Sequence, residues 1–317
     1  MIYAPVIIPT LCRYKHFKRC LESLSRCTGA ENTEVYIGLD FPTKDSHWEG
    51  YNKIKDYLRD CGNLGFKQLH IIERPYNYGL GSNGNYVTLK HELFKKYDRL
   101  ISSEDDNEFA PCFLDYMNKA LEKYKDNPKV YWITGYSHPY IEHITTENII
   151  FKHGVCALGV GLWREKEKEY EKKSFKYFEG EITNWRRLLK VLKSYPLGIP
   201  SEIVMFYRKE IYGDICKGIF CRTEDVYQIW PRVSLVRNWG YDGSGEHCET
   251  NNEFSSQKIS EDLYFELNDL PIKENPKELQ YDRWKKFTKN KVKLIILLIK
   301  VPIYLIGYNI YKILKNN

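Results

Sequence analysis

The sequence lacks several features that would assign it to a class at once. Its nine cysteines form no CxxC pair, and it contains no internal repeat and no low-complexity linker. No segment at its start has the form of a signal peptide, because the chain opens on the β-favouring stretch YAPVIIPT. Several cysteines fall among apolar neighbours, as buried thiols do. We therefore expect one mixed domain that works in a reduced, cytoplasmic compartment.

A strong charge of one sign is also missing. The 48 lysines and arginines exceed the 42 aspartates and glutamates by a formal net charge of only +6, and the lysines are dispersed along the chain. This balance gives little support to a nucleic-acid partner and predicts only a weak attraction to anions such as a nucleotide or anionic lipid. With 317 residues, of which 43% are apolar and 15% aromatic, the chain has ample material for a core.

Short apolar runs alternate with stretches of helical periodicity along the chain. The runs predict strands at 4–10, 33–42, 67–75, 98–106 and 129–137, and the periodic stretches predict helices at 14–27, 48–62 and in the second part of 77–97. Beyond residue 140 the pattern is less regular, with helices predicted within 154–173, 184–196 and 200–213 and a last strand with a Gly-rich loop within 231–248. The alternation is typical of a doubly wound α/β sheet.

Three consecutive carboxylates, Glu104, Asp105 and Asp106, end the fourth predicted strand and precede what is predicted as a helix. Such like charges repel one another unless a divalent cation or backbone donors offset them. Hard oxygen ligands favour Mg²⁺ or Mn²⁺, which complete their shells with substrate phosphates. The triplet therefore indicates a metal and a nucleoside diphosphate. The alternative is a solvated turn in which Asp105 or Asp106 caps the next helix.

The predicted strand ends gather further polar residues. In open parallel sheets, ligands bind beyond the carboxyl ends of the strands. Residues 10–13 and Asp40 also follow predicted strands, so we expect them to open onto the same crevice as the acidic triplet.

The order of these motifs resembles that of a known enzyme family. PVIIPTLCR, a strand ending in Asp40, ERPYNYGLGSNGN and then EDDNEFAPCFLDYM are together similar to a glycosyltransferase of the GT-A fold, a Rossmann-like mixed sheet. The Glu-Asp-Asp segment resembles that of the N-acetylglucosaminyltransferase I family, and GVGLWREKEKEY and PRVSLVRNWGYDGSGEHC strengthen a resemblance to bacterial family 2-like transferases of surface polysaccharides. The resemblance covers residues 3–250 and leaves out the C-terminal tail.

The resemblance implies a role for each matching position. It makes Asp106 a direct ligand of Mn²⁺ or Mg²⁺, with His247 on the metal or the diphosphate. It assigns Glu104 and Asp105 to the donor sugar or ribose, or to orienting the metal's shell. The remaining donor contacts implied by it are Pro9, Thr10 and Arg13 in the nucleotide pocket, Asp40 near the base, and Asn77, Gly79 and Asn83 flanking the donor. Surface charge, turn formation and an ordinary Gly/Asn loop are the alternatives for Arg13, Asp40 and the last group.

An inverting transferase of this kind needs a carboxylate to deprotonate the acceptor. The related enzymes take it from a WDxW-like segment, which this chain lacks. We rank Glu202 first, Asp242 second and Asp225 third as the base. Glu202 has the alternative of a charge at a helix N-terminus.

The C-terminal stretch differs from the rest. It is apolar from Leu294 to Tyr311, but Lys300 and Pro302 interrupt it and lysines flank it. This pattern favours an amphipathic anchor on the membrane surface over a membrane span, the alternative being a helix packed on the domain. We expect a donor half at 1–140, an acceptor half at 141–284 and this tail at 285–317.

The resemblance and the motifs together predict a metal-dependent, membrane-associated glycosyltransferase. It would pass a sugar from a nucleotide donor, expected to be a UDP-sugar, to a lipid-linked glycan of a capsule or O-antigen, with inversion. A sugar nucleotidyltransferase is the rival enzyme, but IPTLCRYK lacks the glycines of its usual GxGxR loop. An inactive carbohydrate- or metal-binding scaffold is the non-enzymatic rival.

Overall fold

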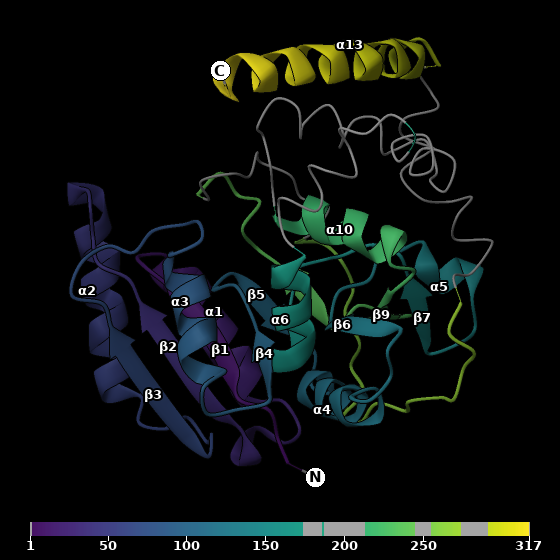
Figure 1. The fold of residues 1–317 in the computed structure, drawn as a ribbon. Coiled ribbons are helices and arrows are strands. Elements are labelled where there is room, and N and C mark those ends of the chain that lie inside the picture. The colour runs from purple at the N-terminus through teal and green to yellow at the C-terminus, as the bar shows by residue number, and fades with distance from the viewer. Residues whose placement is uncertain (1, 174–185, 187–212, 245–254, 274–290, 317) are drawn as a thin grey trace. The chain divides into compact units, whose positions relative to one another are not determined.

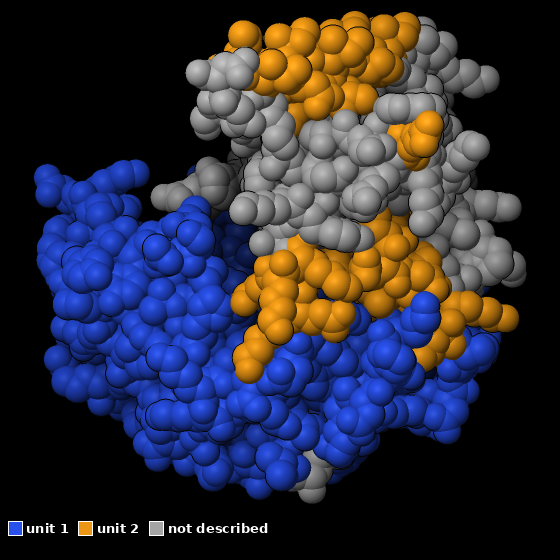
Figure 2. Space-filling view, in the orientation of Figure 1, with its two compact units in different colours: residues 1–150, 156–167, 229–271 blue, residues 151–155, 168–228, 272–317 orange. Residues whose placement is uncertain are grey.

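The structure is a computed structural model that describes residues 2–173, 186, 213–244, 255–273 and 291–316. The chain divides into two compact units (Figure 2). Unit 1 comprises residues 1–150, 156–167 and 229–271, and unit 2 comprises residues 151–155, 168–228 and 272–317. Asp40, Asp105, Asp106 and Asp242 belong to unit 1, whereas Asp225 belongs to unit 2.

An eight-stranded mixed sheet forms the core, in the order β3-β2-β1-β4-β8-β6-β9-β7 (Figure 1). Its strands are β1 (Val6–Thr10), β2 (Glu34–Leu39), β3 (Gln68–Glu73), β4 (Arg99–Ser102), β6 (Val130–Thr134), β7 (Ile149–Lys152), β8 (Val160–Trp163) and β9 (Tyr227–Pro231). The first four are parallel to one another, whereas β8 runs antiparallel to both β4 and β6. The predicted doubly wound, mixed α/β sheet is confirmed.

Helices connect the parallel strands, as the sequence periodicity predicts. They are α1 (Tyr14–Ser25), α2 (Asp45–Asp60) and α3 (Asn85–Leu93), with a short 3-10 helix η1 (Ala30–Asn32) before β2. In α1 the apolar positions Phe17, Cys20, Leu21 and Leu24 are all fully buried. They recur at helical spacing, so one face of α1 lies in the core and its polar face remains outside.

The chain after the acidic triplet differs from the prediction. A three-residue strand, β5 (Asn107–Phe109), comes first, and the helix α4 (Phe113–Lys123) begins only after it. β5 pairs antiparallel with β10 (Val236–Asn238), so that Asn107 lies opposite Asn238. The sequence shows no alternation long enough to predict a strand of three residues. This pairing brings a distant part of the chain beside the triplet.

The later elements are partly as expected. The stretch predicted as a charged helix at 154–173 contains β8 and then α6 (Arg164–Lys172). Glu167 of α6 is buried, where it accepts hydrogen bonds from Lys90 Nζ at 2.9 Å and from Trp132 Nε1 at 2.5 Å. Two further helices are α5 (Ile141–Ile144) and α10 (Gly213–Thr223). The helices predicted at 184–196 and 200–213 fall almost entirely outside the described residues.

The tail forms one helix, α13 (Lys291–Asn316), with Pro302 inside it. Within the part of the chain that the structure describes, no helix is both long enough and apolar enough to cross a bilayer. Six isoleucines of α13 are nevertheless exposed by 45% to 62%: Ile296, Ile299, Ile303, Ile306, Ile310 and Ile313.

Candidate functional site

The site lies where the direction of the strand order reverses. From β1 the chain adds β2 and β3 on one side, and β4 then pairs with the other side of β1. In open α/β sheets, ligands bind beyond the carboxyl ends of the strands at such a reversal, here the ends of β1 and β4. Thr10 ends β1, and Asp105 and Asp106 follow β4.

Arg13 joins the two aspartates of the triplet. Its guanidinium donates from Nη1 to Asp106 Oδ2 at 2.8 Å and from Nη2 to Asp105 Oδ1. The second oxygen of Asp105 accepts the Thr10 hydroxyl at 2.8 Å. Asp105 and Asp106 are only 5% and 6% exposed, whereas Glu104 is exposed. The three carboxylates are therefore not equivalent, and the two buried ones share one cation.

A second loop holds Asp106 from the other side. Asn238, at the end of β10, donates to Asp106 Oδ1 at 2.7 Å, and the Trp239 amide donates to the Asp106 carbonyl at 2.9 Å. Gly240 approaches so closely that an added Cβ would lie 2.1 Å from Asp106 Oδ2. The β5–β10 pairing therefore fixes both the backbone and the carboxylate of Asp106.

The electrostatics follow from this burial. Burial raises the pKa of Asp105, and the charge of Asp106 adds to the rise against the opposing effects of Arg13 and Thr10. Burial also disfavours the charged form of Arg13, but the two carboxylates outweigh it and the pKa of Arg13 lies above its ordinary value. When both carboxylates are ionised, the cluster carries more negative than positive charge.

Asp40 supports the Gly/Asn loop. Its Oδ1 accepts the amides of Phe41 at 2.9 Å and Tyr78 at 2.7 Å, and its Oδ2 accepts the amide of Gly79 at 2.9 Å. Asn77 donates to the Phe41 carbonyl at 2.6 Å. Gly79 has a φ of +60°, which a side chain disfavours. Asp40 therefore ties the loop at residues 77–79 to the end of β2.

Asp242 lies in the loop after β10 and contacts the first turn of α1. Its Oδ2 lies 2.9 Å from His16 Nε2, and its Oδ1 accepts the Ser244 amide at 2.9 Å. Burial works to raise the pKa of Asp242, but the Ser244 and His16 contacts outweigh it and lower the pKa to about 2. His16 stands one helical turn after Arg13, so Asp242 contacts the same end of α1 as the one that carries Arg13.

The remaining predicted residues are dispersed. Asp225 belongs to unit 2, where its Oδ1 contacts His153 Nε2 at 3.1 Å and the Tyr227 hydroxyl at 3.0 Å. Pro9 is half-buried within β1, and Asn83 is exposed in the turn before α3. Glu202 and His247 lie outside the described residues.

The acidic pair has the donor chemistry that Mg²⁺ and Mn²⁺ prefer. Two buried carboxylates lie side by side, and each can accept more hydrogen bonds or ligand contacts than it now receives. Among the residues that the structure describes, no group of three or more histidine, cysteine, aspartate or glutamate side chains is arranged to hold a metal ion. Two carboxylates alone could hold a cation only if ligand phosphates completed its shell, and the Arg13 guanidinium now lies between them.

Sequence reasoning missed Asn238, Gly240 and His16. The signal for the first two is the NWG triplet directly after a short apolar run, since glycine and asparagine at a strand end often mark a close approach of backbone. His16 carries no local signal, because its partner Asp242 is 226 positions away in sequence.

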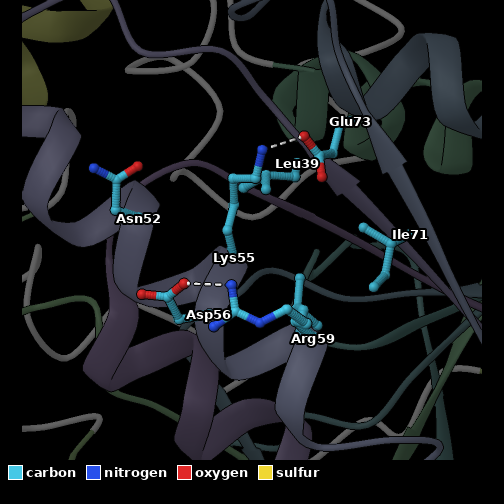
Figure 3. A pocket seen from close by; sticks show the side chains of 8 residues that line it. Leu39, Asn52, Lys55, Asp56, Arg59, Ile71 and Glu73 are labelled. Carbon is cyan, nitrogen blue, oxygen red and sulfur yellow. Dashed lines mark hydrogen bonds and ion pairs between the residues drawn. The ribbon is translucent and has the colours of Figure 1, made fainter.

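A separate groove lies between α2 and the edge strand β3 (Figure 3). Its lining includes Lys55, which bonds Glu73 at 2.7 Å, and Arg59, which pairs with Asp56 at 3.0 Å. None of the predicted site residues is among its lining residues. Its charged residues pair with one another, so we assign the groove no chemistry.

Comparison with known proteins gives a limited result. No family model and no curated protein matches the chain. Solved structures that resemble it include a mannosyltransferase from Pyrobaculum calidifontis in complex with GDP-Man and Mn²⁺, at 14% identity and a TM-score of 0.37, covering 51% of this chain and 45% of that one. S. aureus TarS in complex with UDP-GlcNAc matches at 14% identity and a TM-score of 0.37, covering 53% and 47%. The chain spans less than half the length of both, and these scores identify neither a family nor an activity for it.

Proposed function

We propose that the chain is a metal-dependent glycosyltransferase of the GT-A type that transfers a sugar from a nucleotide donor. The observation that carries the proposal is the pair of buried carboxylates, Asp105 and Asp106, at the strand-order reversal, joined there to Thr10 and Arg13. Buried, crowded carboxylates at the carboxyl ends of parallel strands are expected where a ligand supplies compensating charge.

Asp106 is the proposed metal ligand, with His247 as a second candidate. Bound Mn²⁺ or Mg²⁺ would offset the charge of the leaving diphosphate. The chain's own contribution is orientation: Asn238 and Gly240 hold the Asp106 carboxylate in one position, and Thr10 does the same for Asp105. A carboxylate fixed in advance loses less conformational entropy when a ligand binds.

The donor is proposed to be a UDP-sugar that lies along the ends of β1 and β2. Pro9, Thr10 and Arg13 would border the nucleotide, with Glu104 toward the ribose or sugar. Asp40 acts through the loop at Asn77 and Gly79, which its carboxylate holds, and Asn83 continues that border. The aspartate then shapes the pocket near the base.

The base that deprotonates the acceptor is proposed among Glu202, Asp242 and Asp225. A pKa of about 2 makes Asp242 a weak proton acceptor, since general bases work best with a pKa near the working pH. Glu202 therefore keeps the first rank. Single changes to alanine test each one, and the base is the residue whose loss abolishes turnover while donor binding is kept.

The acceptor is proposed to be a lipid-linked glycan, as in the assembly of a capsule or O-antigen. The exposed isoleucines of α13 support an attachment to the inner face of the cell membrane, because an apolar helix face beside lysines suits anionic headgroups. Inversion at the sugar carbon remains part of this proposal through the resemblance in sequence.

The test is a turnover assay. Purified protein with Mn²⁺ is incubated with a panel of nucleotide sugars, and donor hydrolysis or transfer is followed. We expect one donor to be consumed and Asp106→Ala to abolish its consumption. If no donor binds or turns over and Asp106→Ala leaves metal affinity unchanged, the proposal is wrong. A donor that binds without turnover would favour the inactive scaffold.

A further inference from the structure

We propose that Arg13 and a divalent cation are alternative occupants of the position between Asp105 and Asp106, and that a diphosphate draws Arg13 away so that the cation can enter. The inference rests on the proposed function and describes how the same site is regulated. Arg13 is then a positioning residue that keeps the two carboxylates ready while no donor is bound.

The four carboxylate oxygens divide into two sets. Asp105 Oδ2 and Asp106 Oδ1 accept from neutral donors, the Thr10 hydroxyl at 2.8 Å and the Asn238 amide at 2.7 Å. Asp105 Oδ1 and Asp106 Oδ2 both face the Arg13 guanidinium. If Arg13 leaves, each carboxylate keeps its neutral anchor, and two adjacent oxygens become available together.

The charges favour an exchange. With both carboxylates ionised, the two aspartates and one guanidinium leave one net negative charge in a site that water hardly reaches, since the two aspartate side chains are 6% and 8% exposed. Uncompensated buried charge is unfavourable. A divalent ion between the same oxygens would leave no net charge, so the exchange removes that imbalance.

Arg13 is also the partner able to move. Its side chain is 24% exposed, against 6% and 8% for the aspartates, and its backbone is the N-cap residue at the start of α1. A planar guanidinium donates two parallel hydrogen bonds to phosphate oxygens as readily as to carboxylates. A diphosphate in the crevice therefore offers Arg13 an equivalent partner of greater negative charge.

Two consequences follow. In the absence of nucleotide, Arg13 competes with the metal and weakens its binding. A nucleoside diphosphate removes the competitor, so it should strengthen metal binding, and by reciprocity the metal should strengthen nucleotide binding by the same factor.

The test is a titration of Mn²⁺ alone into the full chain, followed by electron paramagnetic resonance of free Mn²⁺, and repeated with UDP. For Arg13→Met we expect Mn²⁺ alone to bind about tenfold more tightly than to the natural chain, and UDP to add far less to that affinity than it does there. Mn²⁺ binding to Arg13→Met that is equal to or weaker than that of the natural chain overturns the inference.

Arg59→Met is the matched control, because Arg59 is an exposed, ion-paired arginine of the same unit whose partner, Asp56, does not belong to the acidic pair. It should leave Mn²⁺ affinity unchanged. If Arg13→Met unfolds without metal, Arg13→Lys replaces it, since one ammonium cannot donate to both carboxylates as a planar fork does. Its Mn²⁺ affinity should also exceed that of the natural chain, and an unchanged value overturns the inference.

These titrations need no turnover. A chain that consumes a donor but gives the same Mn²⁺ affinity with and without Arg13 contradicts the exchange alone. A chain that consumes no donor but shows the gain in Mn²⁺ affinity contradicts the proposed function alone.

Discussion

Buried carboxylates in this chain are stabilised in two different ways. Asp40 accepts hydrogen bonds from the backbone amides of Phe41, Tyr78 and Gly79, so fixed backbone dipoles stabilise its charge. The carboxylate of Asp106 instead forms an ion pair with Arg13 and accepts a hydrogen bond from Asn238, two side chains from distant segments. The first arrangement is suited to building a loop, and the second to a charge whose partner can change.

The role of Asp40 predicts a loss of stability. Asp40→Ala leaves three amides without their acceptor, and we expect the free energy of unfolding to fall by roughly 1–3 kcal/mol in urea titrations. Asp60→Ala is the control, because Asp60 is an exposed carboxylate at the end of α2 and its loss should change stability by about 0.5 kcal/mol or less. Equal losses in the two variants would contradict the structural role of Asp40.

At single positions, the sequence can predict only chemistry that is local. The adjacent carboxylates of Asp105 and Asp106 after an apolar run predicted a site of concentrated negative charge. The sequence could not show that Glu104 is exposed while Asp105 is buried. That difference depends on Thr10 and Arg13, which come from the end of the first strand and the start of the first helix. Asn238 was missed for the same reason.

Among the secondary-structure elements, the short pair β5 and β10 determines the geometry of the site. It carries Gly240 into contact with the carboxylate of Asp106. The periodicity of the long helices and buried strands was readable from sequence, since each repeats over many positions. A strand of three residues has too few positions to show alternation, so its existence depends on the partner that folding brings to it.

Gly240 gives a prediction about this pair. In Gly240→Ala the added Cβ would meet Asp106 Oδ2 at 2.1 Å, so the carboxylate must move, and we expect Mn²⁺ with UDP to bind at least about tenfold more weakly. Gly218→Ala in α10 is the control, because an added Cβ there meets nothing within 4 Å. Unchanged binding in Gly240→Ala would show that Asp106 needs no fixed position.

The hydrogen bonds of Glu34 in β2 predict how the stability of the fold depends on pH. Glu34 of β2 accepts from Lys67 at 2.8 Å, Tyr97 at 3.0 Å and Tyr36 at 3.1 Å. The Lys67 bond, with those of the two tyrosines and His70, outweighs burial and lowers the pKa of Glu34 from 4.5 to about 2.

Because the folded pKa of Glu34 is the lower one, its contribution is complete above pH 4.5 and is lost as the pH falls toward 2. Urea titrations across this window should show a shallower loss of stability in Glu34→Gln than in the natural chain. The exposed Glu31→Gln serves as control. The same slope in all three proteins would contradict the assignment.

For the chain as a whole, the fold class was predictable because alternation of strand and helix repeats along it. The β8 strand, antiparallel between β4 and β6, was not predicted, since its sequence VGLW runs directly into a charged helix. The proposed division at residues 140 and 284 stays a prediction. The chain also forms two compact units, the first of which draws on three separate stretches of sequence.

The proposed attachment to membranes depends on the C-terminal tail. Removal of residues 291–317 should abolish sedimentation with anionic vesicles, because it removes the six exposed isoleucines of α13. Changing Ile299, Ile303 and Ile306 together to glutamate should do the same, whereas changing them to leucine should not. A truncated chain that still sediments with vesicles would rule out the tail as the anchor.

The central claim is that Asp106 holds a cation on which nucleotide binding depends. The most direct measurement is the affinity for UDP and GDP with and without saturating Mn²⁺, in the natural chain and in Asp106→Asn. We predict that Mn²⁺ raises the affinity of the natural chain for one of them by about tenfold or more, and that Asp106→Asn shows no such gain. Equal affinities with and without Mn²⁺ in the natural chain, or the same gain in Asp106→Asn, would contradict the claim.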